Sequence, residues 1–295
     1  MKKKELIRQI QKYKSSYFLF SFVAIYFIIF SYFPLFKGIV LSFQSNNLIG
    51  HRNFILLDNY SFVLKDPNFI NALRNSLIIG ISDCFLYFSI SLFTALILNE
   101  FTHREIKNTI QTIIYIPYLF SWAVIGGIWS LIFDLNGLIN HIITFTNNSP
   151  IFFLAEPNFA RLLIIGMGIW RSIGYFSLLF TISIMDIDSQ IFDAAKIDSA
   201  NRFQQIIYII IPGIIPTMKT ILVLLTMGIL THFDEIFVMI NPANYSRIST
   251  LLYYVYETGI INFKTGIASS GSTLVMICTV LITIIIRKVS KFDED

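Results

Sequence analysis

Long apolar runs recur along this chain, and their length constrains the fold more than any other feature. A helix needs about 20 predominantly apolar residues to cross the hydrocarbon core of a bilayer. Six runs reach about that length, at residues 17–41, 72–98, 113–133, 159–183, 217–240 and 266–287. Only 14% of the residues are charged, against about a quarter in an ordinary soluble domain. The sequence therefore predicts an all-α polytopic membrane protein with six transmembrane helices.

The apolar runs do not alternate with polar residues as the strands of a membrane β-barrel do. One transmembrane domain is expected over residues 1–295. The first 16 residues carry six Lys and Arg, and the apolar run behind them has no small-residue cleavage site. This pattern predicts an uncleaved signal anchor, because the apolar core of a cleaved signal peptide is shorter.

The distribution of Lys and Arg predicts the orientation. Segments 1–16, 99–112, 184–219 and 287–295 hold six, two, three and three of them, or 14 of the 22 in the chain. Both termini and the 184–219 segment are therefore expected in the cytoplasm. Segments 42–68, 134–158 and 241–265 are expected on the outer side.

The 184–219 segment is the longest of the predicted inner loops. Asp188 or Ser189 can cap a helix that runs from Ile191 to Asp198. Residues 199–201 should break it, and a second helix should run from residue 202 until Pro212 ends it. Two short helices outside the membrane suit docking onto a partner. An interfacial amphipathic turn without a partner is the alternative.

Residues 193–212 resemble the "EAA" loop of bacterial ABC importer permeases, whose pattern is Glu-Ala-Ala, three residues, Gly, nine residues, Ile, one residue, Leu-Pro. Asp193 stands at the Glu position, Ser199 at the Gly position and Pro212 at the Pro position. The resemblance implies that a separate ATPase docks on residues 189–212. The residues it assigns to coupling are Asp193, Ala194, Ala195, Asp198, Ser199, Ala200, Arg202 and Pro212.

Other stretches extend the resemblance over residues 17–288. Residues 57–60 and 66–77 are similar to the "GLDNY…DPxFWxALxNT" stretch of sugar-importer permeases. Pro117, Trp129, Trp170 and Gly174 match further positions, and the chain is identified as a member of the carbohydrate-uptake (maltose/glycerol-phosphate type) ABC importer permeases. Residues 233–242 are more similar to the branch that works with complex oligo- and polysaccharides.

That family implies the mechanism and the partners. A second, different permease subunit would complete the pore, two ATPase subunits would bind ATP and Mg, and an extracytoplasmic binding protein would deliver an oligosaccharide. The implied location is the bacterial cytoplasmic membrane. The chain itself should need no cofactor.

Two departures affect the loop: Asp193 is one methylene shorter than Glu, and Ser199 would cost about 1–2 kcal/mol if the turn is left-handed.

Charged residues within a membrane span are rare and usually functional. Trp, Tyr, Arg and Asn side chains suit sugars, so a translocation path is predicted along the fourth and fifth spans. Its candidate residues are Trp170, Arg171, Tyr175, Asp234, Glu235 and Asn241. Arg171 could instead snorkel to an interface or pair with Asp234 or Glu235. Asp83, in the second span, suits a helix-packing hydrogen bond.

The sequence contains no Gly-x-x-x-x-Gly-Lys-[Ser/Thr] P-loop, so any ATPase must be another subunit. It also has neither metal-ligand spacing nor a catalytic constellation, and we expect neither a metal site nor an enzyme. One alternative is a secondary transporter or channel driven by an ion gradient, which should show an inverted repeat that this sequence lacks. Another is a membrane enzyme on a lipid-linked sugar, for which the cytoplasmic loops offer too few carboxylates.

Overall fold

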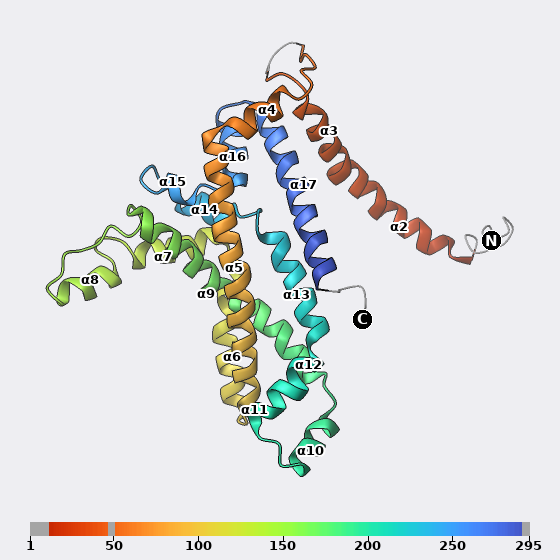
Figure 1. Cartoon of the computed structure of the whole chain (residues 1–295), viewed down its shortest axis with the longest axis vertical. Coiled ribbons are helices and arrows are strands. Elements are labelled where there is room, and N and C mark those ends of the chain that lie inside the picture. The colour runs from red at the N-terminus through yellow and green to blue at the C-terminus, as the bar shows by residue number, and fades with distance from the viewer. Residues whose placement is uncertain (1–11, 47–50, 291–295) are drawn as a thin grey trace.

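The computed structural model describes residues 12–46 and 51–290, and most of them are helical (Figure 1). Within those ranges the only β pairing is an isolated bridge between Gln44 and Phe54. The expected all-α architecture is confirmed. In chain order, the helices are α2 (Lys14–Phe27), η1 (Ile28–Tyr32), α3 (Phe33–Ser42), α4 (Asp58–Lys65), α5 (Pro67–Glu100), α6 (Arg104–Leu119), α7 (Trp122–Ile132), α8 (Leu138–Phe145), α9 (Pro157–Met185), α10 (Ser189–Ile197), α11 (Arg202–Gln205), η2 (Ile206–Ile210), α12 (Ile211–Gly213), α13 (Ile215–Gly228), α14 (Asp234–Met239), α15 (Tyr245–Ile248), α16 (Leu251–Tyr256), η3 (Glu257–Ile261) and α17 (Thr265–Val289).

Four of the six predicted spans are long helices of sufficient length and hydropathy to cross a membrane. They are the α2–η1–α3 stretch, α5, α9 and α17. Two bent helix pairs raise the number of possible spans to six if each pair counts as one. The prediction of six spans therefore stands, although two of the six do not have the expected shape.

The predicted third span, residues 113–133, is wrong as a single helix. The chain instead forms α6 and α7, which meet at an angle of 105°. Phe120 and Ser121 between them have extended backbone, and the Ser121 side chain caps α7 by accepting a hydrogen bond from the Val124 N–H. Hydropathy alone does not reveal this bend because both halves are apolar.

The predicted fifth span, residues 217–240, begins close to where it was expected but is wrong at its far end. Helix α13 begins at Ile215 and already ends at Gly228, and α14 is a separate short helix. The helical stretch before α13 meets it at 65°. Pro212 does not end that stretch, which continues to Gly213. The π-helical turn η2 ends two residues before this proline, which lacks an N–H. A π-turn is one recognised way in which a helix accommodates an interrupted hydrogen-bond ladder.

The core of the bundle lies along α5, which packs most extensively against α9. Glycines permit the closest helix crossings. A Cβ at Gly80 on α5 would overlap the backbone of Ile229. A Cβ at Gly174 on α9 would overlap the Ile114 carbonyl oxygen and lie 2.8 Å from Tyr115 Cα. Helix α5 therefore approaches the chain just after α13, and α9 approaches α6, this closely only because these two positions have no side chain.

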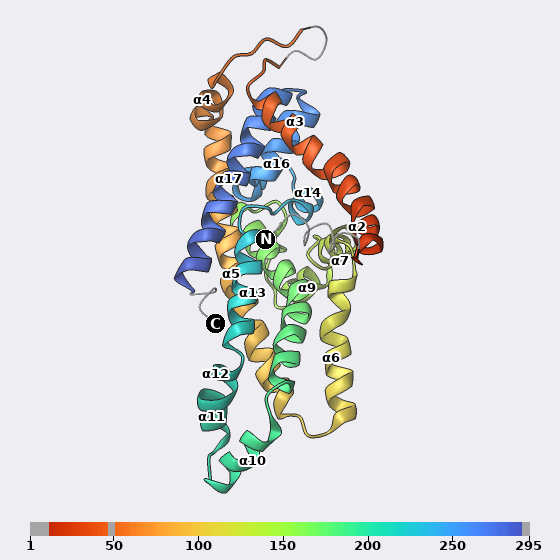
Figure 2. The ribbon, with the colours of Figure 1, turned by 90° about the vertical axis from the view of Figure 1, so that its right-hand side faces the viewer.

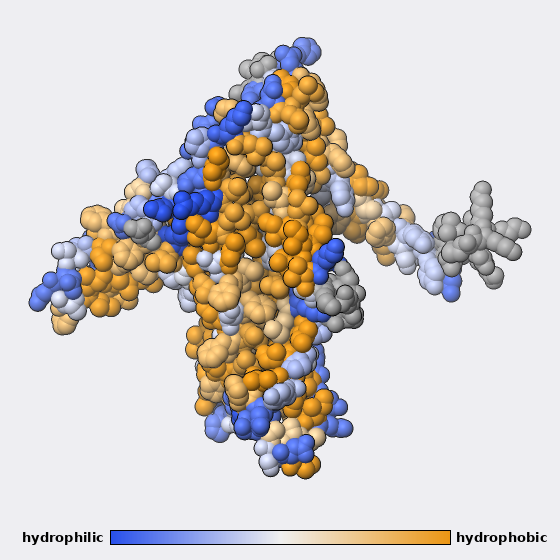
Figure 3. Space-filling model, in the orientation of Figure 1, coloured by the Kyte–Doolittle hydropathy of each residue, from blue (hydrophilic) through white to orange (hydrophobic). Residues whose placement is uncertain are grey.

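The passes of the chain alternate in direction along the long axis of the molecule (Figures 1 and 2). Helix α10 lies at one end, and α4 lies near the other. Helix α2 projects away from the bundle, and none of its side chains is buried. Figure 3 shows apolar residues over the middle of the bundle and hydrophilic residues gathered towards both ends, as a bilayer environment requires.

We expect Gly174→Ala to destabilise the fold because its new methyl group collides with the backbone of α6. Overpacking of this kind typically costs about 1–3 kcal/mol. Thermal unfolding of the purified protein in detergent measures the effect. Gly127→Ala is the matched control, since an added Cβ there meets no atom within 4 Å. Equal melting temperatures for the two variants would contradict the role assigned to Gly174.

Candidate translocation site and coupling surface

The predicted pair of loop helices is present at the end of the molecule. Helix α10 begins after Asp188, whose side chain accepts a hydrogen bond from the Gln190 N–H at 2.9 Å. The sequence allowed either Asp188 or Ser189 as the cap, and the structure identifies Asp188. The chain breaks at residues 198–201, and Asn201 and Gln204 form a reciprocal capping box that starts α11. The Ser199 backbone is left-handed, with φ of 55°.

The surface of this loop is unusually apolar for a segment that projects from the bundle. Ile197 is 84% exposed and Phe203 is 69% exposed. Among the predicted coupling residues, the exposed ones are Asp193, Ala194, Asp198, Ser199, Arg202 and Pro212. Ala195 and Ala200 are half-buried. Figure 2 shows α10 at the tip of the molecule. The exposed small and apolar side chains of the loop form a surface on which another protein can dock.

Two contacts attach this surface to the bundle, and a third holds the surface together. Arg202 Nε lies 3.6 Å from Glu100 Oε2 at the end of α5. The Gln205 side chain donates to the Ala200 carbonyl at 3.0 Å and so joins α11 to the turn before it. Phe192 on α10 packs against the buried cluster around Phe180. A displacement of α10 and α11 would therefore act directly on α5 and on the core.

Arg171 lies near the middle of α9 within an aromatic cage, which we define as Tyr118, Trp122 and Tyr175. The guanidinium carbon of Arg171 is 4.4 Å from the Trp122 ring centroid and 5.0 Å from that of Tyr118. Tyr118 in turn stacks on Tyr175, with centroids 4.6 Å apart. Arg171 Nε donates to the Phe120 carbonyl at 3.3 Å. The structure thus brings Arg171 and Tyr175 together around the break between α6 and α7.

Trp170 lies beside this cage. It is 39% exposed, and its ring centroid is 6.3 Å from that of Trp129 on α7. Aromatic rings and one cation therefore line the junction of α6, α7 and α9. Such a junction offers flat apolar faces for the C–H surfaces of a sugar and N–H donors for its oxygens.

The predicted acidic residues of the fifth span do not join this cage. No ion pair connects Arg171 with Asp234 or Glu235 among the residues that the structure describes. Asp234 is exposed, whereas Glu235 is buried and hydrogen-bonds to His232. The suggested pairing of Arg171 with either carboxylate is therefore absent.

His232 links Glu235 to α5. Its Nε2 atom lies 3.8 Å from Asp83 Oδ2, and the Tyr87 hydroxyl donates to the same Asp83 oxygen at 2.9 Å. The His232 carbonyl accepts a hydrogen bond from Thr250 Oγ1 at 2.7 Å. These contacts hold the non-helical segment between α13 and α14 against α5. The hydrogen bond of Asp83 lies within α5, to Tyr87, and its contact with another element is the one with His232 in a non-helical segment, so the expected hydrogen bond between two packed helices is not the interaction that it makes.

Asn241 has its polar atoms engaged within the loop behind α14. Its side chain donates to the Leu154 carbonyl at 2.9 Å and accepts from the Ala243 N–H at 2.9 Å. Nearby, burial and the hydrogen bond to Glu257 raise the pKa of Tyr245 to about 12, so this phenol stays protonated and donates. The segment is a fixed scaffold, and Asn241 has a structural role in it whatever else it contacts.

Sequence analysis did not identify several residues that form these contacts. Tyr118 and Trp122 flank a helix break that hydropathy does not show, and Glu100 lies 102 positions before Arg202. His232 gave a detectable signal, because it precedes Glu235 by three residues. A histidine and a carboxylate at that spacing can reach each other within an apolar segment, and together they satisfy two polar groups that are costly to bury alone.

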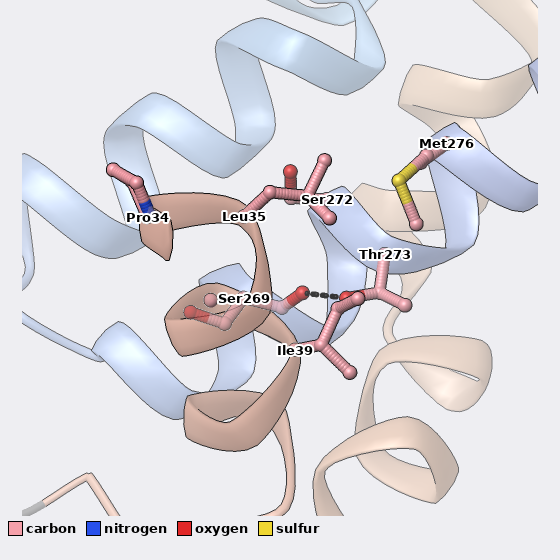
Figure 4. A pocket seen from close by; sticks show the side chains of 8 residues that line it. Pro34, Leu35, Ile39, Ser269, Ser272, Thr273 and Met276 are labelled. Carbon is pink, nitrogen blue, oxygen red and sulfur yellow. Dashed lines mark hydrogen bonds between the residues drawn. The ribbon is translucent and has the colours of Figure 1, made fainter. Parts of the chain in front are cut away.

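A separate hollow of about 220 Å³ lies between α3 and α17 (Figure 4). Its polar lining comes from Ser269, Ser272 and Thr273 on one face of α17. Thr273 donates a hydrogen bond to the Ser269 carbonyl at 2.8 Å. None of the aromatic residues of the Arg171 cage lines this hollow, so it is a distinct feature of the bundle.

Comparison with known proteins connects these features to transport. A family model described as "Binding-protein-dependent transport system inner membrane component" matches residues 88–291. The polygalacturonan/rhamnogalacturonan transport system permease protein YteP of Bacillus subtilis is 28% identical, covering 100% of this chain and 93% of its own length. Protein LplB of the same organism is 30% identical, with 80% and 76% covered.

A solved structure has the same fold over nearly the whole chain. It belongs to a bacterial ABC transporter involved in the import of the acidic polysaccharide alginate. The TM-score is 0.90 at 24% sequence identity, and the match covers 97% of this chain and 98% of that one. The bent helix pairs and the projecting loop thus occur within a known permease architecture.

We expect Glu235→Ala to lower the stability of the protein, because His232 would stay buried after losing its hydrogen-bond partner. Such a loss typically costs about 1–3 kcal/mol. Thermal unfolding in detergent measures it. Asp234→Ala is the control, since Asp234 precedes Glu235 in the same helical turn but is exposed. If the two variants unfold at the same temperature, the His232 contact contributes nothing to stability.

Proposed function

Because the chain belongs to the family of binding-protein-dependent transport system inner membrane components, we propose that it is the permease subunit of an ABC importer for an oligosaccharide. The observation that carries this proposal is the pair of short helices at residues 189–213, which present exposed small and apolar side chains at one end of a membrane bundle. The relative YteP, named for polygalacturonan and rhamnogalacturonan transport, supports a sugar substrate.

The importer would need further subunits. An ATPase dimer, which binds ATP and Mg, would dock on α10 and α11, since this sequence contains no P-loop. A second permease would complete the pore. The unburied apolar surface of α2 suits contact with lipid. An extracytoplasmic binding protein would deliver the sugar at segments 42–68, 134–158 and 241–265.

In this proposal the chain lies in the bacterial cytoplasmic membrane with both termini inside. With six passes through the membrane, the two termini would lie on the same side as α10. ATP-driven closure of the ATPase dimer would move α10 and α11, and the ion pair of Arg202 with Glu100 would transmit the movement to α5. The sugar would pass the junction where Trp170, Arg171 and Tyr175 meet the α6–α7 break.

The orientation is testable with single cysteines in a variant that lacks Cys84 and Cys278. We expect cysteines at Asn46 and Asn147 to react with an impermeant thiol reagent in intact cells. A cysteine at Ser189 should react only after the membrane is opened, because the basic residues around it favour the cytoplasm. Labelling of the Ser189 position from outside would overturn the six-span orientation.

We expect Ala194→Arg to abolish uptake and to reduce co-purification of the ATPase, while the protein still inserts at normal levels. Ala194 is exposed on α10, so a long cation is tolerated by the fold but prevents close approach of a partner. Uptake of labelled oligosaccharides into a strain lacking the native gene measures the effect. Ser15→Arg, an exposed change on α2 far from α10, is the control (Figure 1). Wild-type uptake and normal ATPase recovery with Ala194→Arg would refute docking at this surface.

A further inference from the structure

Arg171 occupies a position where a cation is difficult to keep. The membrane-spanning part of α9 is Phe159–Met185, so Arg171 is 12 residues from one end and 14 from the other. At 1.5 Å per residue, the nearer end is about 18 Å away along the helix axis. A charged residue at that depth is costly unless a counter-charge or water compensates for it. The distance also excludes a lipid headgroup as its regular partner.

The cage satisfies the faces of the guanidinium but not its edge. The rings of Tyr118 and Trp122 provide cation–π contacts at 5.0 and 4.4 Å. Of the five N–H groups, only the one on Nε has a hydrogen bond, to the Phe120 carbonyl. In the described part of the chain, the four terminal N–H groups have no acceptor. They form the fork that binds a carboxylate bidentately.

The carboxylates of the chain that are buried in the bundle are already engaged elsewhere. Glu235 and Asp83 both contact His232, and Asp83 also accepts from Tyr87. Asp234 is exposed and makes no ion pair in residues 12–46 and 51–290. Within residues 12–46 and 51–290, no carboxylate of this chain supplies a counter-charge to Arg171.

Arg161, on the same helix, shows how a structural arginine differs. Its Nη2 donates to Asn75 Oδ1 at 2.6 Å and to the Arg247 carbonyl at 2.9 Å, and its Nε donates to the same carbonyl at 3.1 Å. Those contacts attach α9 to α5 and α15. Arg171 makes no contact of this kind with its terminal nitrogens, so packing of the bundle does not account for its charge.

We propose that Arg171 recognises the anionic group of an acidic oligosaccharide, in which uronate carboxylates bind the open edge of the guanidinium as the sugar passes. This inference rests on the proposed function and adds the charge of the substrate to it. Trp170, Trp122 and Tyr175 supply ring faces for the C–H surfaces of the sugar, while the caged Arg171 selects for the carboxylate. A second permease subunit could add contacts but is not needed to provide this cation.

The experiment measures uptake in a strain in which the native gene is deleted and a plasmid supplies the wild-type chain or a variant. The probes are labelled trimers of galacturonate, mannuronate, guluronate and glucuronate, with the carboxyl-reduced neutral trimer of each as its matched partner. Arg171→Gln removes the charge, and Arg171→Lys keeps the charge but loses the fork. Arg104→Gln is the control, because Arg104 is exposed at the start of α6.

We expect at least one uronate trimer to require the chain, and its uptake KM to rise about tenfold or more in Arg171→Gln. Arg171→Lys should recover part of that loss, and Arg104→Gln should match the wild type. Membrane levels and ATPase co-purification should stay normal in all variants, which separates recognition from assembly. Requirement of the chain for neutral trimers alone, or an unchanged KM in Arg171→Gln, would overturn the inference. If no trimer requires the chain, the proposed function itself fails.

Discussion

Backbone groups inside a bilayer must find partners within the protein, and this constraint shapes both interrupted spans. The chain leaves helical geometry at Phe120–Ser121 and again between Gly228 and Asp234. At each break, a side chain from a distant element satisfies a freed carbonyl. Arg171 donates to Phe120, and Thr250 donates to His232. Contacts from α9 and from the segment before α16 therefore help to hold the two breaks in place.

Sequence reasoning succeeded where the controlling physics is local. Hydropathy over about 20 residues identifies α5, α9 and α17, and an Asp before a polar-apolar run identifies the start of α10. The bends within the third and fifth spans were not predicted, because they depend on residues far along the chain. Tyr118 and Trp122 reach Arg171 only when α6 lies close to α9, and that approach depends on the missing side chain of Gly174. The sequence shows this glycine, but not the helix that contacts it.

Ser199 illustrates how the loop accommodates a departure from its family pattern. The left-handed turn at this position is present, so serine carries a strain of about 1–2 kcal/mol that glycine would avoid. Three hydrogen bonds surround the strained residue, from the N–H groups of Ser199 and Ala200 to α10 and from Gln205 to Ala200. Together they are sufficient to offset the strain. The turn thus keeps its shape without glycine, and the two loop helices keep their relative orientation.

The path from the loop to the Arg171 cage is short and continuous. Only residues 186–188 separate the end of α9 from the start of α10, and the Asp186 N–H still bonds to the Ile182 carbonyl. Arg171 therefore lies on the helix that leads directly into the proposed docking surface. A rigid element with few joints transmits displacement well, provided that it has two stable positions. The break between α6 and α7 lies beside Arg171, and the cage packs across it through ring stacking, cation–π contacts and a single hydrogen bond. In the proposed importer, movement of α10 would shift α9 relative to α7 and so open or close the aromatic cage around the sugar. Sugar recognition and coupling to the ATPase would then both depend on α9, while α6 and α7 would change position relative to it.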